Sequence, residues 1–134
     1  MNRAILFVDD EELILRSLVM QIREHFDSGY IYETARSGEE ALDVLQELAS
    51  LGISTALIIS DWLMPDMKGD ELLIKVHEKY PEIQKIMLTG QVNPEAVSNA
   101  ERNGNLFKCV KKPWDKHYLF NVIDEAMAKD QRRA

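Results

Sequence analysis

The sequence lacks several features that would mark whole classes of protein. It contains 1 cysteine, Cys109, which excludes an internal disulfide and favours a reducing, cytoplasmic setting. No apolar run approaches the roughly 20 residues of a membrane span. Asp9 and Asp10 interrupt the first apolar stretch too early for a signal peptide. We therefore expect a cytoplasmic protein without membrane contact.

Positive charge is also scarce. The chain has 16 Lys and Arg against 23 Asp and Glu, which gives a formal net charge of −7. Phosphate binding needs a concentrated cationic face, so this balance argues against nucleic acid as a direct partner. Hydrophobic residues make up 46% of the 134 residues and charged residues 29%, a globular composition that fits one compact domain.

Short apolar runs alternate with helical patterns along the whole chain. The runs lie at 4–8, 56–59 and 86–88, with weaker ones around 30–32 and 106–110. They are apolar on both faces, as in strands of a parallel sheet that is covered on both sides. Apolar side chains between them recur at helical spacing. The order predicts a strand and a helix repeated about five times, in an open, doubly wound parallel α/β sheet with right-handed crossovers.

Helix boundaries are marked most clearly where apolar patterning is weakest. The segment 95–102 has few apolar residues, but Asn93 as a cap and Pro94 at the first helical position predict its start. Gly104 is the predicted stop. Ser37 with Glu40 predicts a capping box for the second helix. We expect the domain to span 1–129, with 130–134 as a polar tail or the start of a linker to an output domain.

Chemically useful side chains follow four of the predicted strands. In an open α/β sheet, the ligand site lies beyond the carboxyl ends of the strands. Asp9 and Asp10 follow the first apolar run, Asp61 the third, Thr89 the fourth and Lys112 the fifth. Each has a plainer interpretation alone, as a helix cap, a turn or an exposed lysine. Their joint placement favours a single site.

Three carboxylates close together require a cation to stay ionised. Mg²⁺ suits a small set of oxygen ligands and keeps room for a phosphate oxygen. A carboxylate beside such a metal can attack a phosphoryl group, and Lys112 and the Thr89 hydroxyl can hold the transferred oxygens. The end of the second strand, 34–36, offers nothing comparable.

The chain resembles the receiver domain of two-component response regulators, from Ile5 to about Ala128. The residues that carry the resemblance are Asp9-Asp10, Asp61, Met64-Pro65-Asp66-Met67-Lys68-Gly69, Thr89 and Lys112-Pro113. The resemblance implies a flavodoxin-like (βα)5 fold with strand order 2-1-3-4-5. It also implies a domain that is no enzyme apart from catalysing its own phosphorylation and dephosphorylation.

Roles follow from the same resemblance. Asp61 is implied to be the phosphoacceptor and a ligand of Mg²⁺. Asp10 is implied to bind Mg²⁺ directly, Asp9 to bind it through water, and Leu63 to bind it through its backbone carbonyl.

The resemblance assigns the remaining two site residues to the phosphoryl group. Thr89 is implied to move and bind a phosphoryl oxygen, and Lys112 to pair with it. Lys112 is chosen over Lys111 because it directly precedes Pro113, and the Lys-Pro bond is typically cis in the family.

The resemblance also implies partners and an output. The phosphoryl donor is expected to be a sensor histidine kinase or a phosphotransfer domain. Phosphorylation is expected to switch the face formed by the fourth helix, fifth strand and fifth helix. An output domain in the same chain and a homodimer through that face stay open.

One of the departures from the family pattern concerns the aromatic residue that usually responds to phosphorylation. Receivers usually carry Tyr or Phe three residues before the lysine, where this chain has Cys109. Phe107 lies two residues earlier and is predicted by alternation to share the face of Cys109. Whether it substitutes for the aromatic switch stays open.

Two other functions compete with a phospho-accepting receiver. A receiver-shaped interaction module that is never phosphorylated would usually lose an acid or the lysine, and this chain keeps them. A magnesium-dependent phosphohydrolase of the haloacid-dehalogenase kind would place its nucleophile in an Asp-x-Asp pair after the first strand, where this chain has Asp9-Asp10-Glu11.

Overall fold

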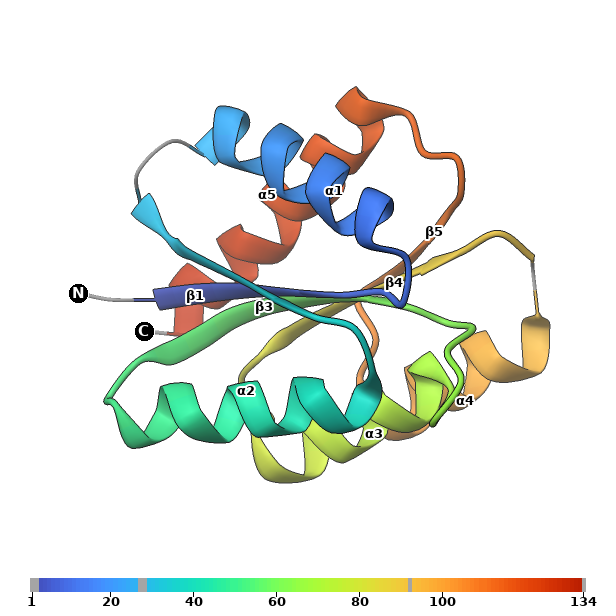
Figure 1. Ribbon diagram of the computed structural model, residues 1–134, viewed down its shortest axis with the longest axis horizontal. Coiled ribbons are helices and arrows are strands. Elements are labelled where there is room, and N and C mark those ends of the chain that lie inside the picture. Colours follow the sequence, from blue (N-terminus) through green and yellow to red (C-terminus); the bar gives the residue numbers. More distant parts are fainter. Residues whose placement is uncertain (1–2, 27–28, 92, 134) are drawn as a thin grey trace.

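The computed structural model describes residues 3–26, 29–91 and 93–133, with the side chains described as far as Lys129. Strands and helices alternate strictly along the chain (Figure 1). In order they are β1 Arg3–Val8, α1 Glu12–Phe26, β2 Ile31–Ala35, α2 Gly38–Ser50, β3 Ser54–Asp61, α3 Gly69–Lys79, β4 Gln84–Thr89, α4 Pro94–Gly104, β5 Lys108–Lys111 and α5 Lys116–Arg133. The predicted repetition of strand and helix is confirmed.

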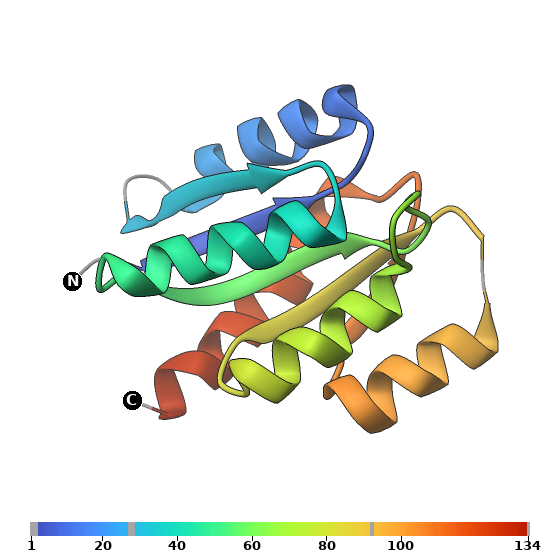
Figure 2. The ribbon, with the colours of Figure 1, turned by 60° about the horizontal axis from the view of Figure 1, so that its bottom comes forward.

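The strands form one parallel sheet in the order β2-β1-β3-β4-β5. Helices α1 and α5 cover one face, and α2, α3 and α4 cover the other (Figures 1 and 2). The doubly wound fold and the strand order 2-1-3-4-5 are therefore confirmed. All carboxyl ends of the strands lie at one edge, where the site residues were predicted to meet.

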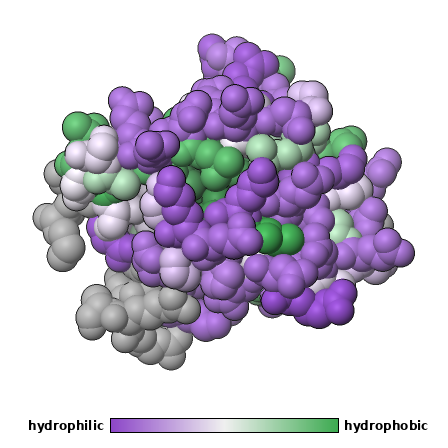
Figure 3. Space-filling view, turned by 90° about the horizontal axis from the view of Figure 1, so that it is seen from below, coloured by the Kyte–Doolittle hydropathy of each residue, from purple (hydrophilic) through white to green (hydrophobic). Residues whose placement is uncertain are grey.

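Alternation along the central strands builds two apolar layers. On β1, Ile5 and Phe7 pack into the layer under α1 and α5, whereas Leu6 and Val8 pack into the layer under α2 and α3. Both pairs are fully buried or nearly so. Each fully buried aliphatic or aromatic side chain stabilises the fold by about 1.5–3 kcal/mol. The outer surface over α2, α3 and α4 is mostly hydrophilic (Figure 3).

The predicted helix starts are confirmed by their hydrogen bonds. The side chain of Ser37 accepts a hydrogen bond from the backbone N–H of Glu40 at 3.0 Å. The Glu40 carboxylate in turn accepts from the backbone N–H of Arg36 at 3.3 Å, one residue before the predicted partner. Asn93 caps α4 by accepting from the N–H of Ala96 at 3.0 Å.

The end of α4 differs from the glycine stop that was predicted. The helix ends at Gly104, but the left-handed residue is Asn105, with φ of 53°. Gly104 has another role, because a Cβ atom there would lie 3.3 Å from the backbone of Leu73 and Ile74. The glycine thus lets the end of α4 approach α3 closely.

Helix α5 continues to Arg133, so the backbone of 130–133, predicted as a polar tail or the start of a linker, extends that helix. Within the described residues, no helix combines the length and apolar character needed to cross a membrane.

Candidate functional site

The carboxyl edge of the sheet brings the predicted site residues together. Asp9 and Asp10 follow β1, Asp61 ends β3, Thr89 ends β4 and Lys112 follows β5. A cavity of about 640 Å³ opens at this edge. Its lining residues are Asp10, Glu11, Asp61, Trp62, Leu63, Met64, Pro65, Thr89, Gly90, Gln91 and Lys112.

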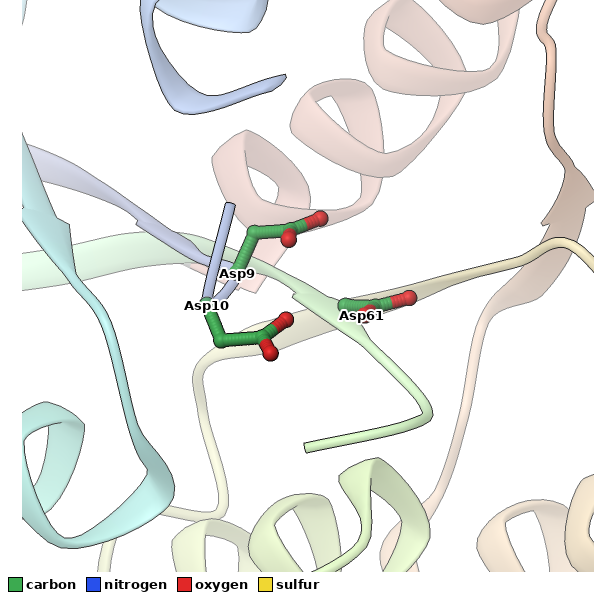
Figure 4. Close-up of side chains that lie close together, drawn as sticks. All are labelled: Asp9, Asp10 and Asp61. Atoms are coloured by element: carbon green, nitrogen blue, oxygen red, sulfur yellow. The ribbon is translucent and has the colours of Figure 1, made fainter. Parts of the chain in front are cut away.

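The three aspartates form a compact acidic cluster. One carboxylate oxygen from each of Asp9, Asp10 and Asp61 lies within 4.8 Å of the others. The side chains extend from the ends of β1 and β3 toward the same side (Figure 4). Asp9 is fully buried and Asp61 is 6% exposed, so their charges are poorly solvated. A hard divalent cation with oxygen ligands fits this donor set.

Lys112 joins two of these carboxylates. Its Nζ atom donates to Oδ2 of Asp9 at 2.8 Å and lies 3.0 Å from Oδ1 of Asp61. Its neighbour Lys111 is exposed. The peptide bond between Lys112 and Pro113 is cis, as the resemblance implied.

Burial and pairing shift two pKa values in the cluster. Burial raises the pKa of Asp61, and the charge of Asp9 adds to this against the lowering effect of Lys112. Burial acts to lower the pKa of Lys112, but its hydrogen bonds to both carboxylates outweigh burial and raise it. The lysine therefore stays charged, while the Asp61 carboxylate is held in an environment that disfavours its negative charge.

The hydroxyl of Thr89 is engaged outside the acidic cluster. It donates to the backbone carbonyl of Gln91 at 2.6 Å and accepts from the N–H of Gln91 at 3.2 Å. The carbonyl of Thr89 accepts from the N–H of Lys112 at 2.8 Å, which holds the ends of β4 and β5 together. Moving the hydroxyl toward Asp61 would therefore break its hydrogen bonds to Gln91.

The loop after Asp61, residues 62–68, is tightly folded. The N–H of Gly69 donates to the carbonyl of Trp62 at 2.7 Å. A Cβ atom at Gly69 would lie 2.3 Å from the carbonyl oxygen of Asp61. Leu63 is 57% exposed at the rim of the cavity, whereas Met64 is buried. We call 62–68 the acceptor loop.

Arg36 contacts the backbone of the site, although the end of the second strand was predicted to offer nothing comparable to the other strand ends. Its Nη2 atom donates to the backbone carbonyl of Asp10 at 2.9 Å. The residue follows β2, which lies beside β1 in the sheet, so its place next to the β1 end could have been predicted from the strand order.

The prediction that Phe107 shares the face of Cys109 is wrong. Cys109 pairs with Met87 and packs into the layer under α2, α3 and α4. Phe107 packs into the opposite layer, and Nζ of Lys129 lies 5.0 Å from its ring centroid. Strand alternation does not apply because β5 begins only at Lys108. Phe107 therefore cannot act on the α4 side.

Comparison with known proteins identifies the family. Residues 5–124 match the response regulator receiver domain. The chain belongs to the response regulator receiver family. Phosphorylation on an aspartate follows from membership of this family, whose domains work in two-component signalling.

Named relatives include regulators and isolated receivers. The transcriptional regulatory protein GlrR of Escherichia coli (strain K12) is 32% identical over 124 residues, which make up 92% of this chain and 26% of GlrR. The receiver fold is shared by a CheY-like response regulator receiver domain protein from Methanospirillum hungatei JF-1, with 29% identity and a TM-score of 0.86 over 100% of this chain and 99% of that one.

A third relative was solved in an activated state. The beryllofluoride-activated receiver domain dimer of NtrC4 is 28% identical, with a TM-score of 0.81 over 97% of this chain and 99% of that one. The chain spans 13% to 52% of the length of the first curated relatives it matches.

Proposed function

We propose that this receiver accepts a phosphoryl group on Asp61. The observation that carries the proposal is the contact of Lys112 with both Asp9 and Asp61 at 2.8 and 3.0 Å. This contact keeps the positive charge of Lys112 beside the Asp61 carboxylate, and both residues line the open cavity. A carboxylate oxygen of Asp61 would attack phosphorus, and the leaving group would depart with the bonding electron pair.

Mg²⁺ fits the acidic cluster, because carboxylate oxygens converge there and their mutual repulsion needs a cation. Asp10 and Asp61 would bind it directly, Asp9 through water, and Leu63 through its backbone carbonyl. When bound, Mg²⁺ supplies neutralisation of the charge on the phosphoryl oxygens.

Two side chains would bind the transferred group. The ammonium of Lys112 would bind a phosphoryl oxygen. The raised pKa of Lys112 supports this role, because the side chain then carries its positive charge. Thr89 would exchange its hydrogen bonds to Gln91 for one to the phosphoryl group. The domain would turn over only its own aspartyl phosphate and no other substrate.

The proposal extends to the partners of this chain. The donor would be a histidine kinase or a phosphotransfer domain in the cytoplasm. The output would be a change of the face formed by α4, β5 and α5, read by an output domain or a second copy of the receiver. The dimer formed by the NtrC4 receiver supports the latter. Residues 1–129 would form the receiver unit, and 130–134 would be a polar tail or the start of a linker to an output domain. The receiver unit would make no direct contact with nucleic acid or a membrane.

Incubation with a small acyl phosphate and Mg²⁺, followed by intact-mass measurement, tests the acceptor. We expect wild type to gain one phosphoryl group and Asp61→Asn to gain none. Asp43→Asn, which changes an exposed acid on α2, is the matched control and should keep the uptake. Equal uptake by Asp61→Asn and wild type would overturn the assignment.

A further inference from the structure

A line of hydrogen bonds connects the residue after the acceptor with α4. The indole N–H of Trp62 donates to Oδ1 of Asp70 at 3.0 Å. The side-chain NH₂ of Asn99 on α4 donates to Oδ2 of the same carboxylate at 2.9 Å. Both oxygens of Asp70 are therefore used, one toward the acceptor loop and the other toward α4.

The orientation of the Asn99 amide is fixed by its neighbours. A carboxylate can only accept, so the NH₂ group of Asn99 must face Asp70. The amide oxygen then faces the other way, where it accepts from the side-chain NH₂ of Asn103 at 2.8 Å. Asp70 is 8% exposed, so solvent is a poor substitute for these partners.

The near end of this line is attached rigidly to the acceptor. Trp62 directly follows Asp61, and its N–H donates to the carbonyl of Leu88 on β4 at 3.0 Å. Gly69 packs on the carbonyl of Asp61 and donates to that of Trp62, which connects the acceptor to the first turn of α3 and thus to Asp70. The ammonium of Lys68 lies 5.1 Å from the centre of the Trp62 ring, within the range of a cation–π contact.

The far end of this line lies on α4, which has one main packing partner. Helix α4 packs chiefly against α3, beside the edge of the sheet (Figure 2). Its last residue, Gly104, touches the backbone of α3 closely. Toward its start, a cleft of about 360 Å³ separates α4 from α3 and is lined by Trp62, Asp70 and Asn99 among others. The helix is therefore packed closely on α3 at its end, and the Asn99–Asp70 hydrogen bond joins it to α3 at its middle.

We propose that Trp62, Asp70 and Asn99 form a relay through which loading of Asp61 repositions α4. This inference rests on the proposed phosphorylation of Asp61. Any rotation of Trp62 that follows loading must either move the Asp70 carboxylate or break the Trp62–Asp70 hydrogen bond. In both cases the hydrogen bond between Asp70 and Asn99 changes, and Asn99 is part of α4. The relay supplies a route on the α4 side, where Cys109 replaces the usual aromatic and Phe107 faces the opposite layer.

Amide hydrogen exchange of 94–104, before and after loading with beryllium fluoride and Mg²⁺, tests the relay. We expect loading to change exchange in the first half of α4 in wild type. Asn99→Ala should reduce that change by roughly 2- to 30-fold, the range expected for residues along a coupled network. Trp62→Phe, which keeps a ring and removes the N–H donor, should reduce it similarly when compared at equal loaded fraction, and the double variant should add little.

Asn103→Ala is the matched control, since it removes a hydrogen bond between two residues of α4 and leaves the Asn99–Asp70 bond in place. It should keep the wild-type response. Phosphoryl uptake from an acyl phosphate, measured on the same samples, separates the two proposals. Uptake by Asn99→Ala with an unchanged α4 response overturns the relay alone. Absence of uptake by wild type overturns the proposed function and the relay with it.

Discussion

The ammonium of Lys112 lies 3.0 Å from Oδ1 of Asp61, in contact with the carboxylate that is proposed to receive the phosphoryl group. The same ammonium donates to the fully buried Asp9. Its positive charge thus compensates two poorly solvated negative charges whenever no metal is bound. Removing it has consequences for the fold as well as for the chemistry.

Lys112→Ala should lower the free energy of unfolding of the metal-free protein by about 3 kcal/mol, because it leaves buried carboxylates without a cation. Addition of Mg²⁺ should recover part of the loss. Urea unfolding with and without Mg²⁺ measures both effects. Lys111→Ala, one residue away and exposed, controls for the loss of a positive charge. Equal stabilities of the two variants would contradict the prediction.

Gly69→Ala should destabilise the fold by about 3 kcal/mol, since the added methyl group would meet the backbone of Asp61 and Trp62, which cannot rotate away. It should also reduce phosphoryl uptake, because the acceptor would shift. Gly29→Ala adds the same methyl group where nothing lies within 4 Å. That control should match wild type in thermal unfolding and in uptake, and a similar loss in both variants would argue against a specific backbone contact.

The left-handed backbone of Asn105 should decide how substitutions at this position change the free energy of unfolding. Asn105→Ala should cost about 1 kcal/mol, because a Cβ-bearing residue without a short polar side chain is strained at positive φ. Asn105→Gly should equal or exceed wild type in stability, since glycine adopts this conformation freely. Chemical denaturation of the three proteins gives the order, and an alanine variant as stable as the glycine variant would contradict the prediction.

Asp66 should make stability depend on acidity. Its carboxylate accepts from the backbone N–H groups of Gly38 at 3.1 Å and Glu39 at 2.9 Å. Slight burial acts to raise the pKa of Asp66, but these hydrogen bonds outweigh it and lower the pKa below its usual value of 3.8. Because the folded pKa is depressed, the stabilisation is present above the unfolded pKa and is lost as pH falls through the folded pKa.

Asp66→Asn should therefore be less stable than wild type at neutral pH, and the difference should shrink between about pH 4 and pH 2. Urea unfolding across that range measures it. Asp43→Asn, which removes an exposed carboxylate in the middle of α2, controls for the loss of a charge. A difference between Asp66→Asn and wild type that stays constant with pH would contradict the assignment.

The fold could be predicted from the sequence because the central strands are apolar on both faces and two helices, α2 and α4, carry clear start signals. The gathering of Asp10, Asp61 and Lys112 followed from their positions at strand ends. The contact of Asp70 with Asn99 could not be predicted, since it depends on how α4 settles against α3. Phe107 was misplaced because it lies one residue before β5 begins, where the alternation of side chains along a strand no longer applies.

The acceptor loop is also locked against α2, through a contact with a consequence for sequence variation. A Cβ atom at Gly38 would lie 2.3 Å from Cγ of Met67, so the methionine side chain in its present position requires a glycine at the start of the helix. Positions 38 and 67 should accordingly covary among relatives, with a bulkier residue at one accompanied by a smaller residue at the other. A loop exchanged between two receivers would need its partner at position 38 to be exchanged as well.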